Sequence, residues 1–241
     1  MKIYRTASRL LYAASLWSVL FGPWPAQCRA QTIAPVIVEY VEKAEGKFQI
    51  VNNSLYPLNV VLEPKSFAVD AQGNPSYHPL EPGIHVRLST MSFRLPARQT
   101  FTVFYEAEAD RLPAWFTIYA TMVAPTKNDF KVALALPHTV YLLTRKSLSP
   151  DSVSLIQAEF RREERCVQVE VENRGERFGR VQEVELLSAS GKKTYASFPL
   201  FPGQRRRLHL DWELPVEPQR IVLKFRHFKL EHSIHMVAGS Q

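Results

Sequence analysis

Residues Phe130 to Lys146 read FKVALALPHTVYLLTRK, and apolar side chains occupy almost every second position of this stretch. Only His138 interrupts the apolar row. A period of two residues over more than a dozen positions is typical of one long β-strand. At about 3.3 Å per residue, such a strand extends roughly 45 to 50 Å, which is more than a small domain covers. We therefore predict that part of it lies at a sheet edge, where unpaired backbone groups invite another chain to pair.

The first 30 residues have the organisation of a secretory signal peptide. Three basic residues precede an apolar run from Leu10 to Phe21, and Cys28-Arg29-Ala30 has the small-residue spacing of a cleavage site. The apolar run, of about 12 residues, is too short to span a bilayer. We predict a signal peptide over residues 1–30 and export to the periplasm. A lipoprotein signal at Cys28 is the alternative.

Removal of this segment changes the charge and the cysteine content of the chain. The full sequence has 30 Lys and Arg against 23 Asp and Glu, a formal net charge of +7. The segment contains four basic and no acidic residues, so the remaining chain has 26 against 23 and a net charge of +3. No basic stripe interleaved with aromatic residues remains, so we expect no nucleic-acid binding. Only Cys166 is left, which excludes an internal disulfide, and we interpret it as a small core residue.

The rest of the chain has the pattern of short strands. From Pro35 onward, β-branched and aromatic runs alternate with Pro, Gly, Asn and Asp, and no helical period exceeds about two turns. The polar region from Asp70 to Gly83 is predicted to be a long loop. Ser147 to Asp151 is the predicted linker, because Pro150 ends strand pairing and the hydrophobic pattern then restarts. We predict an all-β fold with two tandem β-sandwich domains, over residues 31–147 and 151–241.

Several stretches resemble known proteins in their order and spacing. They are FQIVNNSLYP, LPARQTFTVFYEAEADRLPAWFTIYA, KVALALPHTVYLLTRKSL, VEVENRGERFGRVQEVELLSASGK and FPLFPGQRRRLHL. Together they are similar to segments of the periplasmic pilus (fimbrial) chaperones of the PapD-like type, and the chain resembles a divergent member of that family. The resemblance implies that both sandwiches are immunoglobulin-like and are set at an angle to each other.

The resemblance also implies a subunit-binding donor strand. An alignment without gaps on Arg145 gives the donor positions Phe130, Val132, Leu134 and Leu136. Their side chains would fill the groove of a pilus subunit that lacks its last strand, and each well-buried Val or Leu would contribute about 1.5 to 3 kcal/mol. The alternative interpretation is that these side chains fill the core of their own domain, because every half-buried strand alternates.

The predicted cleft residues, Tyr141 and Arg145, depart in part from the family pattern. The family anchors the terminal carboxylate of the subunit with two basic residues, one on the first strand and one on the long strand. Here Tyr141 takes the second place, and the first strand, VIVEYVE, has Glu39 and Glu42 but no Arg. A Tyr hydroxyl donates a single hydrogen bond to a carboxylate, which is weaker than the charge of a Lys. Arg145 matches an interdomain ion-pair residue, and we predict that it is a structural hinge residue.

The function implied by the resemblance is that of a chaperone. It would cap an incomplete pilus or fimbrial subunit with its alternating edge strand and deliver the subunit to an outer-membrane usher. The expected partners are such subunits and the usher, and self-association into a dimer would also cover the exposed strand. The alternative function is a structural or adhesive envelope protein with the same fold and no subunit donation. A secreted enzyme is a third, more distant interpretation.

Other chemistry finds little support in the sequence. His227, His232 and His235 match no ligand spacing of a known metal site. The run from Arg205 to Arg207 is interpreted as a solvated strand start, because successive strand residues point to opposite faces. No nucleophile elbow, zinc-protease motif, phosphate loop or paired-carboxylate signature is present. We therefore predict no enzyme activity, no catalytic residues, no cofactor and no metal site.

Overall fold

The computed structural model describes residues 30–124 and 133–237, which form twenty β-strands and one short 3-10 helix. The first ten strands are β1 (Thr32–Ala34), β2 (Ile37–Val41), β3 (Ala44–Val51), β4 (Leu58–Val69), β5 (Pro75–Pro79), β6 (Ile84–Leu88), β7 (Ser92–Leu95), β8 (Thr100–Ala109), β9 (Ala114–Val123) and β10 (Ala133–Leu143). After helix η1 (Pro150–Ser152) come β11 (Val153–Arg161), β12 (Cys166–Asn173), β13 (Gly179–Val181), β14 (Glu183–Ser188), β15 (Gly191–Tyr195), β16 (Phe198–Leu200), β17 (Arg205–Asp211), β18 (Arg220–Lys224), β19 (Lys229–Ser233) and β20 (His235–Val237).

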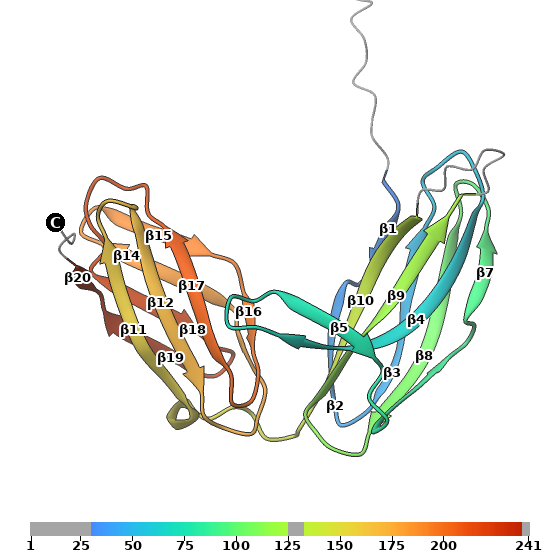
Figure 1. Cartoon of the computed structure of the whole chain (residues 1–241), viewed down its shortest axis with the longest axis horizontal. Helices are drawn as coiled ribbons and strands as arrows, with labels where there is room; N and C mark the ends of the chain where they lie inside the picture. The colour runs from blue at the N-terminus through green and yellow to red at the C-terminus, as the bar shows by residue number, and fades with distance from the viewer. Residues whose placement is uncertain (1–29, 125–132, 238–241) are drawn as a thin grey trace, which may run out of the picture.

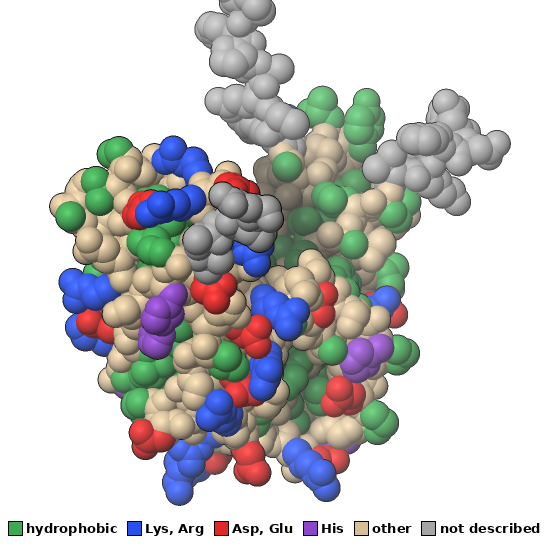
Figure 2. Space-filling model, turned by 60° about the vertical axis from the view of Figure 1, so that its left-hand side comes forward, with side chains coloured by type: hydrophobic (Ala, Val, Ile, Leu, Met, Phe, Trp, Pro, Cys, Tyr) green, Lys and Arg blue, Asp and Glu red, His purple; other side chains and the backbone are tan. Residues whose placement is uncertain are grey.

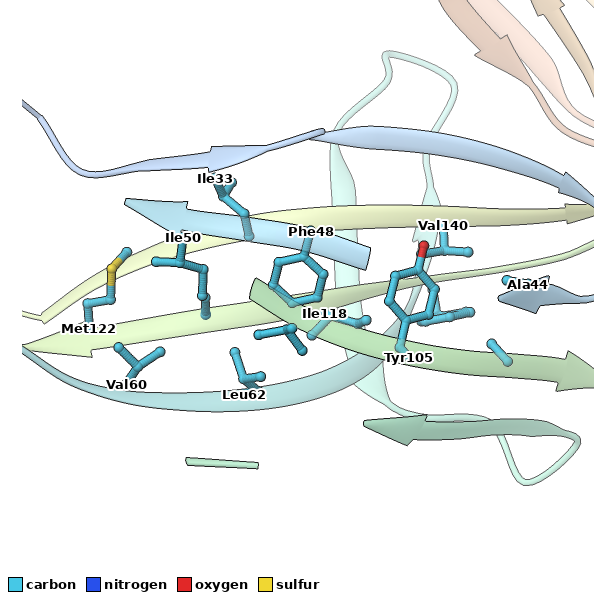
Figure 3. Packing of buried hydrophobic residues seen from close by; sticks show 14 of the residues in the cluster. Ile33, Ala44, Phe48, Ile50, Val60, Leu62, Tyr105, Ile118, Met122 and Val140 are labelled. Atoms are coloured by element: carbon cyan, nitrogen blue, oxygen red, sulfur yellow. The ribbon is translucent and has the colours of Figure 1, made fainter. Parts of the chain in front are cut away.

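Strands β1 to β10 build two sheets around one core. One sheet has the order β1-β3-β8-β6, and the other has the order β2-β10-β9-β4-β5, with β7 also paired to β4. Among these pairs β2 and β10 are parallel, and the others are antiparallel. Figure 3 shows Phe48 and Tyr105 from the first sheet packed toward Ile118 and Val140 from the second. The apolar alternation of these strands therefore makes a sandwich core.

Strands β11 to β20 build a second core. Their sheets have the orders β17-β12-β11-β20, β13-β16 and β15-β14-β18-β19. Trp212 is 1% exposed and is the largest fully buried side chain of the described residues. In the described chain, no strand ladder joins the first ten strands to the last ten. Figure 1 shows two sandwiches at an angle, with the hairpin of β4 and β5 reaching from the first to the second. The predicted fold class is thus confirmed.

The structure corrects some predicted elements. The segment predicted as a long loop, Asp70 to Gly83, contains β5, which pairs with the end of β4. Its three prolines favoured the loop interpretation, but the two that lie in β5 are at the edge of the sheet, where Pro is tolerated. The predicted strand Arg180 to Leu187 is divided at Gln182, so that its two parts belong to different sheets. In the part of the chain that the structure describes, no helix has the length and apolar character to cross a membrane.

Candidate binding edge and interdomain cleft

Strand β10 has two different neighbours. It pairs with β9 from Ala133 to Leu142, but it pairs with β2 only from Thr139 to Leu143. Within the described residues, the segment from Ala133 to His138 therefore has no strand partner on its second side. We call this segment the open edge of β10.

The hydrogen-bonding groups at the open edge follow from the register. The Thr139 amide donates to the Val36 carbonyl on the β2 side, at 2.7 Å. Because backbone groups of successive strand residues point in alternate directions, Ala135 and Ala133 direct their N–H and C=O groups to the same side. Pro137 also faces this side and offers only its carbonyl, because Pro has no N–H. A proline is tolerated here since no ladder hydrogen bond of the domain itself is lost.

The predicted donor positions differ in burial. Leu134 is 37% exposed, whereas Leu136 is half-buried and packs against the first core. Further along the same face of β10, Val140 and Leu142 are fully buried. The apolar side chains on this face of β10 therefore become more exposed toward the N-terminal end of the strand. Phe130 and Val132 lie outside the described residues.

His138, the polar exception in the row, is buried in a hydrogen-bonded network. Its ring stacks on Phe48 with centroids 4.6 Å apart. Its Nδ1 atom lies 2.7 Å from the Pro35 carbonyl and its Nε2 atom 3.0 Å from the Tyr105 hydroxyl. This arrangement fits a neutral ring, in which Nδ1–H donates to the carbonyl and Nε2 accepts from the hydroxyl. Burial lowers the pKa of His138. This network links Pro35, in the segment that precedes β2, to strand β10 at the point where the open edge ends.

Tyr141 lies between the two sandwiches and is only 4% exposed. It belongs to an aromatic cluster with Phe67 from the first sandwich and with Phe178 and Phe201 from the second. The rings of Tyr141 and Phe178 are 4.8 Å apart. Burial raises the pKa of the Tyr141 hydroxyl. The structure thus places this predicted cleft residue inside the packed contact between the two sandwiches.

A cation from the second sandwich joins this contact. The Arg180 guanidinium lies 5.1 Å from the centre of the Tyr141 ring, and its Nε donates to the Glu39 carboxylate at 2.5 Å. Its Nη2 atom is buried without a hydrogen-bond partner in the described part of the chain. Arg145, the other predicted cleft residue, is exposed and pairs with Glu42 at 2.7 Å. Because Glu42 follows β2, this ion pair lies within the first sandwich and does not join the two.

The hairpin of β4 and β5 forms a second contact between the sandwiches. The Arg207 amide donates to the Ala71 carbonyl at 2.7 Å, and the Gln204 side-chain amide donates to the Val69 carbonyl at 2.9 Å. Gly73 has a φ of +96°, and a Cβ atom there would lie 1.6 Å from the Arg206 guanidinium. The positive φ favours glycine at this turn, whereas the Arg206 guanidinium is the end of a flexible side chain and can move aside. Together with the aromatic cluster, the hairpin joins the two sandwiches, and we expect these contacts to restrict the angle between them.

The face of this sheet that carries Tyr141 also has exposed apolar side chains, with polar residues such as Thr117 and Lys65 between them. Residues on the same face of the sheet as Tyr141 include Ile37, Val61 and Tyr77, which are 49%, 54% and 42% exposed. Figure 2 shows hydrophobic side chains gathered on the upper part of the first sandwich, whereas charges of both signs are spread over the second sandwich in front of it. We call Ile37, Val61 and Tyr77 the cleft surface.

Sequence reasoning missed three features of this region. The position of Pro137 at the open edge could have been predicted from the sequence, since a Pro within a strand indicates a sheet edge. The pairing of Arg180 with Glu39 joins residues 141 positions apart and has no local sequence signal. The cleft surface was missed because its residues come from three separate strands.

Comparisons with known proteins agree with this architecture. No family model and no curated sequence matches the chain. The crystal structure of the YadV chaperone matches with a TM-score of 0.55 and 9% identity, over 85% of this chain and 100% of that chain. The chain has the fold of the fimbrial chaperones.

Two further structures with this chaperone fold are similar. One is from the complex of the Salmonella enterica SafA pilin with the SafB chaperone, with a TM-score of 0.53 and 13% identity over 86% of this chain and 97% of that chain. The other is the class 5 fimbriae chaperone CfaA, with a TM-score of 0.52 and 12% identity over 85% of this chain and 99% of that chain. The resemblance seen in the sequence is therefore confirmed at the level of the fold.

Proposed function

We propose that this protein is a periplasmic chaperone that binds a pilus or fibre subunit with an incomplete β-sandwich, before delivery to an outer-membrane usher. The observation that carries the proposal is the open edge of β10. It offers backbone donors and acceptors beside an exposed Leu134. A subunit that lacks a strand needs both a ladder partner and apolar side chains, and addition of a strand supplies them together.

The energy available at the described part of the edge is moderate. Burial of a whole Leu side chain contributes about 1.5 to 3 kcal/mol, so covering the exposed third of Leu134 contributes roughly 0.5 to 1 kcal/mol. Each new ladder hydrogen bond adds about 0.5 to 1.5 kcal/mol. Of the cleft surface, Ile37 lies next to the open edge, opposite Thr139, and supplies further apolar area for contact. Tight capture therefore depends on pairing and side-chain burial acting together.

The test is capture of subunits from the native periplasm. We expect the purified protein to retain small β-rich subunits that lack a final strand, identified by mass spectrometry. Leu134→Asp should abolish this capture, because it places a charge in the subunit's apolar groove. The matched control is Ile156→Asp, which changes a side chain of similar exposure, 42%, in the second sandwich. Unchanged capture by a folded Leu134→Asp variant would remove the proposal.

A structural or adhesive envelope protein is the second candidate. It is favoured by the contact between Arg180 and Glu39, because the cation in the cleft already has a carboxylate partner. Tyr141 is likewise enclosed by aromatic rings rather than open to a ligand. Recovery of mature envelope proteins with complete folds, in place of incomplete subunits, would support this candidate.

A further inference from the structure

Cys166 lies on the outer face of the sheet β17-β12-β11-β20. Along β12, Val167, Val169 and Val171 pack into the second core, so Cys166 points to the opposite face. Its direct neighbours across the ladders are Arg161 on β11 and Asp211 on β17. Residues opposite each other in antiparallel strands have Cβ atoms about 4.5 to 5.5 Å apart. The topology therefore places polar side chains around the thiol.

These side chains form a compact group of metal-binding types. The Cys166 Sγ donates to a Glu164 carboxylate oxygen at 3.5 Å. One ligand atom each of Glu164, Cys166 and His209 lies within 4.8 Å of the others. The His209 Nε2 lies 3.5 Å from an Asp211 carboxylate oxygen. Cys166 itself is buried, whereas Glu164 and His209 are exposed, so an ion can reach the group from solvent without opening the core.

We propose that Glu164, Cys166 and His209 bind one divalent cation of the zinc type. A thiolate, an imidazole and a carboxylate are the donors that Zn²⁺ prefers. In a tetrahedral site, bond lengths of about 2.0 to 2.3 Å place the ligand atoms about 3.3 to 3.8 Å apart. Exposed side chains at 164 and 209 need to move inward by roughly 1 Å to reach this geometry. Water would fill the fourth position, and Asp211 would orient the His209 ring.

The charges around the group agree with a divalent ion. Glu164 and Asp211 are acidic, and Arg161, which pairs with Glu164 at 3.1 Å, is the adjacent cation. On binding, the thiol releases its proton to water and Cys166 becomes a thiolate. The thiolate, Glu164 and Asp211 then carry three negative charges next to an ion of charge +2, which favours binding of the cation. Arg161 competes for Glu164, and its exposed side chain must turn away when the ion binds.

Cobalt(II) is the probe for this site, because it replaces zinc and reports a sulfur ligand by absorption. The protein is used without a histidine tag and in reduced form. We expect one equivalent of Co²⁺ to produce a thiolate-to-cobalt charge-transfer band in the near ultraviolet, and Zn²⁺ to displace it. Cys166→Ser should lose the band. Asp211→Asn should keep it and lower the Zn²⁺ affinity about 10- to 100-fold.

The control variants separate this site from adventitious binding. His227→Ala changes an exposed histidine outside the group and should leave the spectrum and affinity unchanged. Arg161→Ala removes the competing cation and should tighten binding. Because Cys166 is buried, thermal unfolding without metal must show that Cys166→Ser is folded, and the exposed His209→Ala provides a second variant that should weaken binding. Absence of the charge-transfer band, or its persistence in Cys166→Ser, would overturn the proposal.

Discussion

Acid should destabilise the first sandwich through His138. Burial lowers the pKa of this residue below its ordinary value of 6.5, and the unfolded chain keeps the ordinary value. Below about pH 6.5 the unfolded state therefore binds a proton that the folded state resists. The stabilising contribution is present above that pH and is lost as the pH falls.

The size of the effect follows from the linkage relation. A single histidine that titrates only in the unfolded state removes at most about 1.4 kcal/mol between roughly pH 7.5 and pH 5.5. In His138→Phe the ring stacking on Phe48 is retained, but the hydrogen bonds to Pro35 and Tyr105 are lost. At neutral pH this loss should cost about 1 to 3 kcal/mol. The wild type is therefore more stable at neutral pH, and the difference from the variant shrinks in acid.

Urea unfolding at the two pH values measures this difference. Tryptophan fluorescence is a suitable signal, because Trp115 lies in the first sandwich and Trp212 in the second, so the unfolding of each contributes to it. Subtracting the free energies of wild type and variant cancels the titration of all other groups that the substitution leaves unchanged. His85→Asn, which changes an exposed histidine of the same sandwich, should keep the pH dependence of the wild type. If His138→Phe has the same pH dependence as the wild type, the assigned role of His138 is refuted.

Two further predictions concern the edge and the contact between the sandwiches. Ala135→Pro removes an N–H from the open edge, so we expect stability to change little and subunit capture to weaken. Leu136→Pro should instead destabilise the protein, because it breaks the ladder with β9. Equal unfolding curves for the two variants would contradict this orientation of the backbone groups. Gly73→Ala forces a side chain toward Arg206 at a positive φ and should cost about 1 to 2 kcal/mol. Its effect should appear as a wider range of interdomain distances in X-ray scattering while both cores stay folded, and an unchanged scattering curve would show that the hairpin does not fix the angle.

The sequence predicted the positions of the strands better than it predicted which strands pair with each other. Alternation alone was sufficient to place Leu134 and Val140 on one face of a long strand, because side-chain direction has a period of two. It did not predict where pairing with β2 begins, since that depends on the Val36 carbonyl, about 100 residues earlier in the chain. Pairing partners at that separation are set by the packing of the whole domain.

The cleft was only partly predictable for a similar reason. The alignment on Arg145 predicted Tyr141 as a cleft residue, and in the structure its ring packs in one cluster with Phe67, Phe178 and Phe201. The rings that enclose it, Phe178 and Phe201, come from the second sandwich and carry no local signal of this contact. Glu39 was noted as an unexpected acid on the first strand, but its partner Arg180 was interpreted only as the start of a strand.

The junction at Thr139 implies competition between two segments for one side of β10. The segment before β2 already occupies the Thr139 amide through the Val36 carbonyl, and the His138 ring holds the adjacent Pro35. An incoming strand that pairs from the start of β10 therefore meets an occupied position after Pro137. The incoming strand must either leave the sheet at this point or displace the residues around Val36 from β10. If the proposed subunit strand pairs with β10, the strength of the His138 network would set how far along β10 that strand advances.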